Sequence, residues 1–99
     1  MALIYHVTTK QEWERAMQKG NYTVRSLESE GFIHCCEDKQ VNGVLERYYA
    51  GKKGLVKLVI DTKKLIPVLK YEFATSVNEH FPHVYGPINL DAVLHVEMI

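Results

Sequence analysis

The chain has 99 residues, which suffices for one domain with its own hydrophobic core. Its 12 basic and 12 acidic side chains cancel, so it lacks the net charge by which nucleic-acid and anionic-membrane binders attract their partners. The first residues show no signal-peptide pattern, and no apolar stretch approaches the roughly 18 residues of a membrane span. Cys35 and Cys36 are adjacent, an arrangement that rarely forms a disulfide. We therefore expect a single cytoplasmic domain covering residues 1–99.

The first third of the chain predicts a strand followed by a helix. Residues 3–8 alternate between two faces, as in a strand. Residues 9–12 fit a capping box, and the apolar spacing that begins at Trp13 is typical of an amphipathic helix, which Gly20 would end. Residues 21–30 read as irregular, with a short strand near residues 24–27. Residues 31–35 predict a short apolar strand that contains His34.

The rest of the chain predicts one more helix and several strands. A helix is expected at about residues 37–50. Gly43 inside it costs about 1 kcal/mol relative to alanine, which suggests either close approach by another element or sequence drift without a structural reason. Residues 55–60 and 68–73 predict strands, and residues 81–87 a loop stiffened by two prolines. The last strand is expected at residues 93–98, with Leu94, Val96 and Met98 inward. The predicted fold class is α+β, with a mixed, twisted sheet of five or six strands and two main helices.

Familiar catalytic motifs are absent from the sequence, so any site must be assembled from residues far apart in the chain. His6 and Thr8 share the outer face of the first strand and could together hold a hydroxyl-bearing ligand such as ribose. A solvated or half-buried pair on a sheet face is the alternative. His34 lies in an apolar segment, where an unpaired polar group costs a few kcal/mol to bury, so it must be bonded to backbone or line a cavity.

The other candidate residues lie on the 81–87 segment, on the strand predicted at residues 68–73 and on the second helix. His83 and Tyr85 sit between prolines in a stiff segment that suits either ligand contacts or a structural turn. Glu72 is a candidate acid. Arg47 could bind a phosphate or carboxylate, although surface exposure is the alternative. No metal site is expected, because the adjacent cysteines point apart in a strand and do not match zinc-ligand spacing.

Several segments carry a family resemblance. Residues 4–9, 30–35, 81–87 and 90–93, with shorter matches at 12–13, 26–27 and 40–41, resemble the bacterial family called domain of unknown function 952. The resemblance covers nearly the whole chain, and Gly-Phe-Ile-His and Phe-Pro-His-x-Tyr-Gly-Pro are its most specific parts. It implies a fold similar to ADP-ribosyltransferases, including the RNA 2′-phosphotransferases that consume NAD.

The resemblance also implies roles for individual residues. It places His6 and Thr8 at a nicotinamide ribose and gives His34 another ribose or phosphate role. It lets Tyr85 stack on the nicotinamide ring and makes Glu72 the glutamate, late in the chain, that stabilises the oxocarbenium-like state. Glu72 and His34 are thereby the candidate catalytic residues. Where the family usually has Ser or Thr, this chain has Cys36 at the expected helix N-cap, so Cys36→Ser is predicted to raise stability by about 0.5–1 kcal/mol.

The expected function is that of a small ADP-ribosyltransferase-like domain, which binds NAD or another ribose-containing small molecule and transfers or cleaves at a ribosyl carbon. No cofactor is certain from the residues, and NAD is the candidate. The alternative is a non-catalytic metabolite-binding or protein-interaction module. The expected partner is a small molecule, with no membrane and with nucleic acid disfavoured, and the oligomeric state stays open. The resemblance suggests that His6, His34 and His83 surround one ligand pocket, which requires their imidazoles to lie within about 10 Å of one another.

Overall fold

The computed structural model describes residues 2–99. In chain order its elements are β1 (Leu3–Thr9), α1 (Lys10–Lys19), β2 (Asn21–Tyr22), α2 (Arg25–Ser29), β3 (Ile33–His34), a 3₁₀ turn (Asp38–Gln40), α3 (Val41–Tyr48), β4 (Leu55–Asp61), β5 (Val68–Ala74), β6 (Glu79–Tyr85), β7 (Ile88–Asn89), a second 3₁₀ turn (Leu90–Ala92) and β8 (Val93–Met98). Within these residues the strands form three antiparallel sheets, ordered β1-β4-β8, β2-β7 and β3-β6-β5.

The α+β class is confirmed, but the single mixed sheet is not. The described residues form eight strands in three sheets, and every strand pair is antiparallel. Strand β3 lies within the strand predicted at residues 31–35. Strands β2 and β7 have only two residues each, which is too short for alternation to show in the sequence. The two predicted main helices correspond to α1 and α3, and the short α2 replaces the strand expected near residues 24–27.

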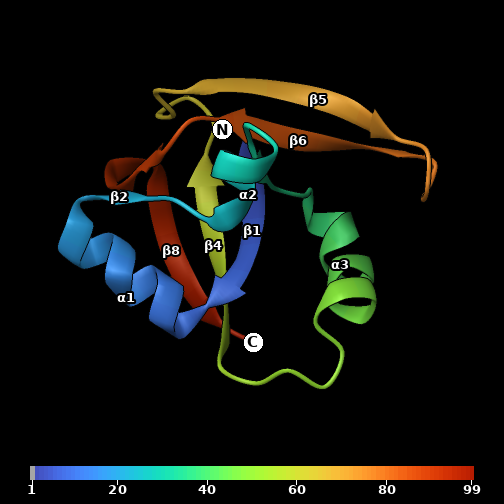
Figure 1. The fold of residues 1–99 in the computed structure, drawn as a ribbon, viewed down its shortest axis with the longest axis horizontal. Coiled ribbons are helices and arrows are strands. Elements are labelled where there is room, and N and C mark those ends of the chain that lie inside the picture. Colours follow the sequence, from blue (N-terminus) through green and yellow to red (C-terminus); the bar gives the residue numbers. More distant parts are fainter. Residues whose placement is uncertain (1) are drawn as a thin grey trace.

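Two packed clusters hold the sheets together on opposite faces of β1. Figure 1 shows the β5–β6 hairpin lying across the ends of β1, β4 and β8, with α1 and α3 on opposite sides. The larger cluster joins Ile4, Tyr22 and Leu58, all without exposed surface, to α1 and β6 residues. The smaller cluster packs Val7 against α3. The first strand is therefore covered on both faces, and the expected outer face of His6 and Thr8 is buried.

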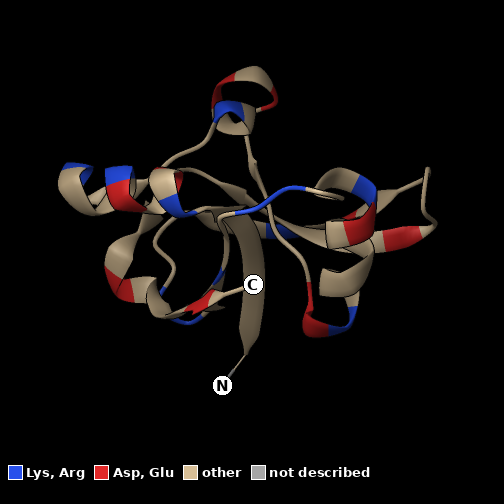
Figure 2. Cartoon of the chain, turned by 90° about the horizontal axis from the view of Figure 1, so that it is seen from below, with Lys and Arg blue, Asp and Glu red and all other residues tan. Residues whose placement is uncertain are grey.

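The first helix begins and ends where the sequence predicts. The Thr9 hydroxyl accepts a hydrogen bond from the Glu12 backbone N–H at 3.1 Å. The Glu12 carboxylate pairs with Arg15 at 2.9 Å, so only one half of the capping box forms. Gly20 takes the left-handed conformation at φ 98° and donates its N–H to Ala16. Basic and acidic residues are interspersed on the helices (Figure 2).

The start of the second predicted helix differs from expectation. Glu37, and not Cys36, is the N-cap of the 3₁₀ turn, where it forms a reciprocal capping box with Gln40. Cys36 instead pairs with Tyr5 through two backbone hydrogen bonds, of 2.8 and 2.7 Å, and is only 2% exposed. The capping argument for Cys36→Ser is therefore wrong. Gly43 is approached closely by the side chain of its own helix neighbour Arg47, at 3.0 Å from an added Cβ.

Two further expectations at the carboxyl-terminal end are corrected. Residues 81–85 belong to strand β6 and not to a loop. A proline is tolerated at position 82 of this strand. The Pro82 carbonyl accepts from the Cys35 N–H just past the end of β3, so the N–H that proline lacks would lie outside the β3–β6 ladder. Val96 and Met98 lie opposite the buried Leu58 and Val56 but are exposed, because β8 is an edge strand of its sheet. No helix within residues 2–99 is long and apolar enough to cross a membrane.

Candidate functional site

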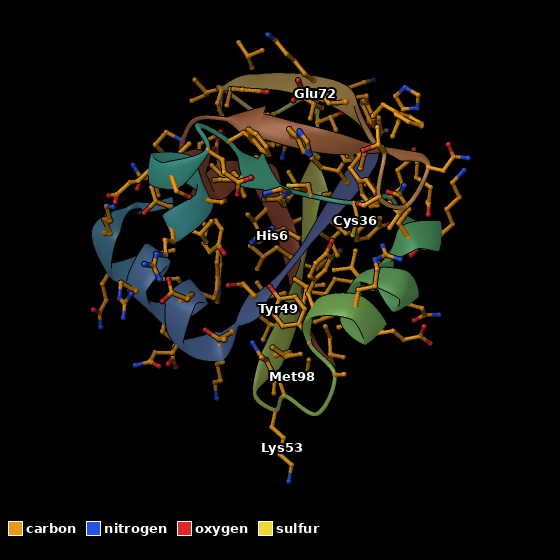
Figure 3. All side chains as sticks on the ribbon, turned by 45° about the vertical axis from the view of Figure 1, so that its right-hand side comes forward. His6, Cys36, Tyr49, Lys53, Glu72 and Met98 are labelled. Atoms are coloured by element: carbon orange, nitrogen blue, oxygen red, sulfur yellow. The ribbon has the colours of Figure 1, made fainter. Side chains whose placement is uncertain are left out.

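A cavity of about 470 Å³ lies where the edge of β1, the segment after β3, α3 and the β5–β6 hairpin meet. Figure 3 shows Tyr49 between β1 and α3, and Cys36 on the segment that joins β3 to α3. We call this cavity the histidine pocket, and its lining residues are Tyr5, His6, Val7, His34, Cys35, Cys36, Val44, Tyr48, Tyr49, Ala74, Ser76, Val77, Phe81 and His83.

The three candidate histidines line this one pocket. His34 of β3 lies directly opposite His83 of β6 in the antiparallel register, so their side chains share a sheet face. Their ring centroids are 5.2 Å apart and the rings meet nearly edge to face. The backbone carbonyl of His34 is bonded by His6. The separation of less than about 10 Å that a shared ligand requires is met by His34 and His83, and His6 lines the same pocket.

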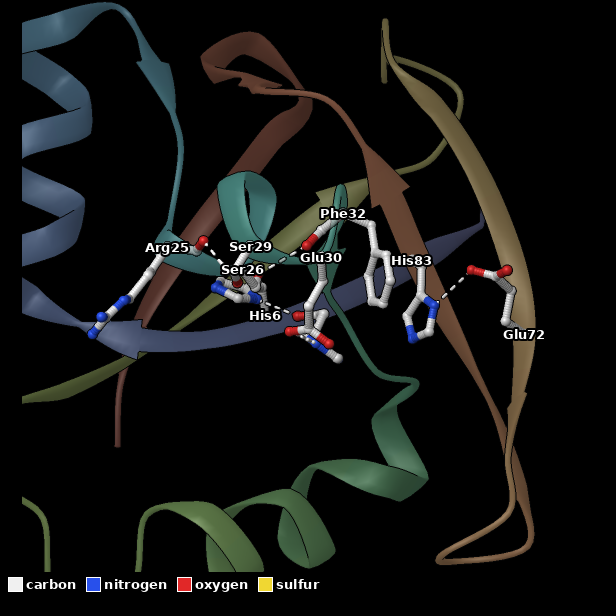
Figure 4. Close-up of polar contacts among 9 residues, drawn as sticks. His6, Arg25, Ser26, Ser29, Glu30, Phe32, Glu72 and His83 are labelled. Carbon is white, nitrogen blue, oxygen red and sulfur yellow. Dashed lines mark hydrogen bonds and ion pairs between the residues drawn. The ribbon is translucent and has the colours of Figure 1, made fainter.

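His83 is held in place from two sides. Its Nδ1–H donates to a carboxylate oxygen of Glu72 at 2.8 Å, and the Tyr85 hydroxyl donates to the same oxygen. The hydroxyl of Tyr85, with a further contribution from His83, holds the pKa of the Glu72 carboxyl below its usual range. The Phe32 ring stacks on the other side of His83 at 4.0 Å (Figure 4). His83 Nε2 receives no hydrogen bond from the described residues, so it is open toward the pocket.

His34 has the opposite arrangement of partners. Its Nε2–H donates to the Glu30 carboxylate at 3.0 Å, and both of these side chains are about half exposed. Its Nδ1 takes no hydrogen bond from residues 2–99. The Phe32 ring meets His34 edge to face at 4.8 Å, so one aromatic ring contacts both imidazoles. Each histidine therefore has one ring nitrogen fixed by a carboxylate and the other one free.

His6 is a buried anchor more than a free ligand contact. Its Nδ1–H donates to the His34 carbonyl at 2.5 Å, and its Nε2 accepts from the Tyr22 hydroxyl at 2.7 Å. Burial lowers the pKa of His6 to about 4, which keeps the ring neutral. Because both nitrogens have protein partners, a ribose hydroxyl can reach His6 only by displacing one of them.

The remaining predicted site residues lie behind or beside the pocket. Thr8 is buried on the Tyr22 side of β1 and does not line the cavity. Glu72 and Tyr85 lie behind His83, and the Tyr85 ring faces Lys70 at 5.1 Å. Arg47 lies over the Tyr48 ring at 5.8 Å from its centroid, outside the lining set. Direct ligand contact by these four residues stays a prediction.

Sequence reasoning missed the aromatic part of the pocket. Tyr48 and Tyr49 stand at the end of α3, where their spacing continues an apolar helix face, but Tyr48 is 61% exposed. Tyr49 donates its hydroxyl to the Val7 carbonyl at 3.1 Å, so it presents its ring to the cavity. Phe81 was read only as the start of a stiff segment. Two consecutive tyrosines at a helix end were the available signal.

The thiols at the pocket are poor nucleophiles. Burial raises the pKa of Cys36 to about 11, although nearby Lys57 opposes the shift. Burial also raises the pKa of Cys35 well above its usual range. Both side chains are thus protonated thiols near neutral pH. Across the described chain no group of three or more His, Cys, Asp or Glu side chains is arranged to hold a metal ion.

Comparison with known proteins identifies the family of the chain. No curated protein shows significant similarity to it. The crystal structure of protein CC0527 from Caulobacter crescentus is 27% identical, with a TM-score of 0.86, and the match covers 96% of this chain and 83% of that one. The solution NMR structure of CC0527 is 28% identical, with a TM-score of 0.81, over 97% and 83% of the two chains. Residues 7–96 match the family described as Protein of unknown function (DUF952), and the chain belongs to that family.

Proposed function

We propose that the domain binds a ribose-containing small molecule, such as NAD, a nucleotide or a nucleoside, in the histidine pocket and acts on it by glycosyl transfer. The observation that carries the proposal is that His34 and His83 lie 5.2 Å apart in one cavity with His6 adjoining them. A volume of about 470 Å³ falls within the roughly 300–1,000 Å³ typical of small-molecule sites.

The lining chemistry suits a sugar attached to a flat ring. The free nitrogens of His34 and His83 can hydrogen-bond hydroxyl groups, as donors or acceptors according to their protonation. Tyr48 and Tyr49 offer aromatic surface on α3, and Phe81 offers more on β6. Polar groups that fix orientation among apolar walls are the usual composition of such a site.

An ADP-ribosyltransferase-like fold is part of the same proposal. It is supported by the resemblance of the His6-x-Thr8 strand to the ribose-binding strand of those enzymes. In the present geometry His6 would act by holding the His34 segment against β1, because its own nitrogens are occupied. Glu72 would act through His83, since its carboxylate is bonded to that ring.

The alternative is a module that binds the same ligand without turning it over. One observation favours it: the lining set, as the structure describes it, contains no carboxylate, and Glu72 is turned toward His83 and Tyr85. Carboxylates are the groups that most often stabilise an oxocarbenium-like state at a ribosyl carbon. Binding without turnover of NAD or of a nucleoside would select this alternative.

The binding experiment needs only the purified domain. Thermal unfolding and calorimetry would be measured with NAD, ADP-ribose, mononucleotides, nucleosides and inorganic phosphate. A ligand at about one hundred times its Kd should stabilise the fold by about 2.7 kcal/mol. His83→Asn should weaken that ligand, while His95→Asn should not, because His95 is exposed on β8 and does not line the pocket. If no ligand shifts the wild-type midpoint, the proposal fails.

A further inference from the structure

We propose that His83 is a general base and His34 a general acid in the hydrolysis of the N-glycosidic bond of an uncharged nucleoside. This inference rests on the ribose-binding function proposed above, and it assigns the substrate class and the proton transfers. It starts from one geometric fact, which is that two imidazoles line one cavity and each has one nitrogen on a carboxylate and the other without a partner in the described chain.

The hydrogen bonds define which nitrogen of each ring can react. A carboxylate only accepts, so Glu72 fixes the proton of His83 on Nδ1 and leaves the lone pair on Nε2. Glu30 likewise binds the Nε2–H of His34 and leaves Nδ1 for the ligand. This is the arrangement in which an imidazole is oriented by a carboxylate while its second nitrogen transfers a proton.

The surroundings of the two rings assign their roles. The His83 side chain is 13% exposed, stacked on Phe32 and tied to Glu72, so its lone pair is preoriented to take a proton. The His34 side chain is 54% exposed and can therefore exchange protons with solvent. At 5.2 Å between centroids, both rings can reach neighbouring atoms of one ligand.

The reaction balances with water as the only co-reactant. His83 Nε2 takes a proton from water while the water oxygen forms a bond to C1′ of the ribose. The C1′–N bond breaks, and its electron pair leaves with the nucleobase. His34 enters the step as an imidazolium whose Nε2–H stays bonded to Glu30. It gives its Nδ1 proton to the leaving nitrogen, so the products are ribose and the free base. Proton exchange with solvent then returns both histidines to their starting forms.

The electrostatics of the lining select an uncharged substrate. No Lys, Arg, Asp or Glu occurs in the lining set of the described chain. A phosphate or diphosphate taken into such a cavity would lose water and find no cation other than a protonated His34, which is already paired with Glu30, so its binding is costly. Arg47, the candidate for a phosphate contact, lies against Gly43 and Tyr48 of its own helix. Lys57, which lies over the Tyr5 ring, is paired with Glu97. A nucleoside fits this environment better than its phosphate or NAD.

The test combines binding with product release. Adenosine, inosine, cytidine and uridine would be incubated with the protein, and free base would be quantified by liquid chromatography. AMP and NAD serve as charged counterparts, with their affinities compared by calorimetry. We expect a nucleoside to bind more tightly than its phosphate and to release free base.

The variants separate reacting from positioning residues. His83→Asn and His34→Gln should each lower kcat by at least about 100-fold, the usual worth of a general base or acid, in addition to the weaker binding expected when a hydrogen bond of the pocket is lost. Glu72→Gln should lower kcat by a smaller factor at unchanged KM, because Glu72 positions His83 and does not line the pocket. His95→Asn should leave both parameters unchanged.

Each outcome decides a different point. Tighter binding of AMP or NAD than of adenosine overturns the uncharged-substrate assignment while the ribose-binding function stands. Nucleoside binding without release of free base, or release that survives both histidine variants, overturns the acid–base assignment alone. Failure of every probe to bind overturns the proposed function and this inference with it.

Discussion

The buried His6 makes the fold sensitive to mild acid. In the folded protein burial lowers the pKa of His6 to about 4, against 6.5 for an unperturbed imidazole. The ring has no room for a counterion, because His34 and Tyr22 occupy its two nitrogens. Lowering the pH from neutral should therefore destabilise the fold before the carboxyl groups begin to titrate.

The sign and size of the effect follow from linkage. Between pH 6.5 and about 4 the unfolded chain binds a proton at His6 that the folded chain does not, so stability rises with pH. The slope approaches about 1.4 kcal/mol per pH unit. Between about pH 7.5 and about pH 4.5 the loss in free energy of unfolding is then about 2.5 kcal/mol. The lowered pKa of Glu72 adds acid sensitivity only below its unfolded value of 4.5.

Urea unfolding at the two pH values measures this loss directly. His6→Asn should cost about 1–3 kcal/mol near neutral pH, because it leaves the Tyr22 hydroxyl without its acceptor, and it should also flatten the pH dependence. His95→Asn should retain the wild-type slope. An NMR titration of the wild-type ring gives a second measurement if His6→Asn does not fold. A ring that titrates near 6.5 in the folded protein would refute the reasoning.

Three substitutions test the packing by urea unfolding against the wild type. Gly86→Ala should destabilise the fold by about 1–3 kcal/mol, because its Cβ would lie 2.8 Å from the Cβ of Pro67 in a ring that cannot swing away. Gly43→Ala should stabilise it by up to about 1 kcal/mol, because only the flexible end of Arg47 must move. Cys36→Ser should destabilise it by about 1–3 kcal/mol, since the new hydroxyl is buried in an apolar cluster.

Particular results would contradict these three predictions. A neutral Gly86→Ala would mean that the segment after β6 moves away from β5 at little cost. A destabilised Gly43→Ala would mean that the Arg47 contact over the helix matters more than helix propensity. A stabilised Cys36→Ser would restore the capping interpretation that the structure argues against.

Local patterns predicted local structure well. The cap at Thr9 and the glycine stop of α1 involve contacts within four residues, so the sequence displays them directly. The short strands β2 and β7 could not be predicted, because each exists only through its pairing with the other, far along the chain. Strand β3 was predicted, since it lies within the apolar run of residues 31–35. The fold class needed only the periodicity of the long segments, whereas the division into three sheets needed those distant pairings.

The candidate site shows the same difference between what local patterns predict and what depends on distant strand pairings. His34 and His83 were singled out because each lies in an apolar segment, and their proximity depends on one register between β3 and β6. The hydrogen bond from His83 to Glu72 depends on the β5–β6 register, which single-sequence alternation does not contain. Glu72 was therefore assigned a direct role, although its carboxylate lies behind the histidine.

His6 connects the stability of the fold to the geometry of the pocket. Its Nδ1–H bonds the carbonyl of the residue whose ring would donate the proton, so β1 and β3 are joined at His34. Protonation would add a hydrogen at Nε2 of His6, the nitrogen that accepts from Tyr22, so it would break that bond and place a charge in the core. The Nδ1–H bond to the His34 carbonyl favours the charged ring, so the junction itself persists in the folded state. Unfolding at mildly acidic pH would open the junction together with the rest of the fold and separate the His34 and His83 rings. Ligand affinity should therefore fall together with stability at mildly acidic pH.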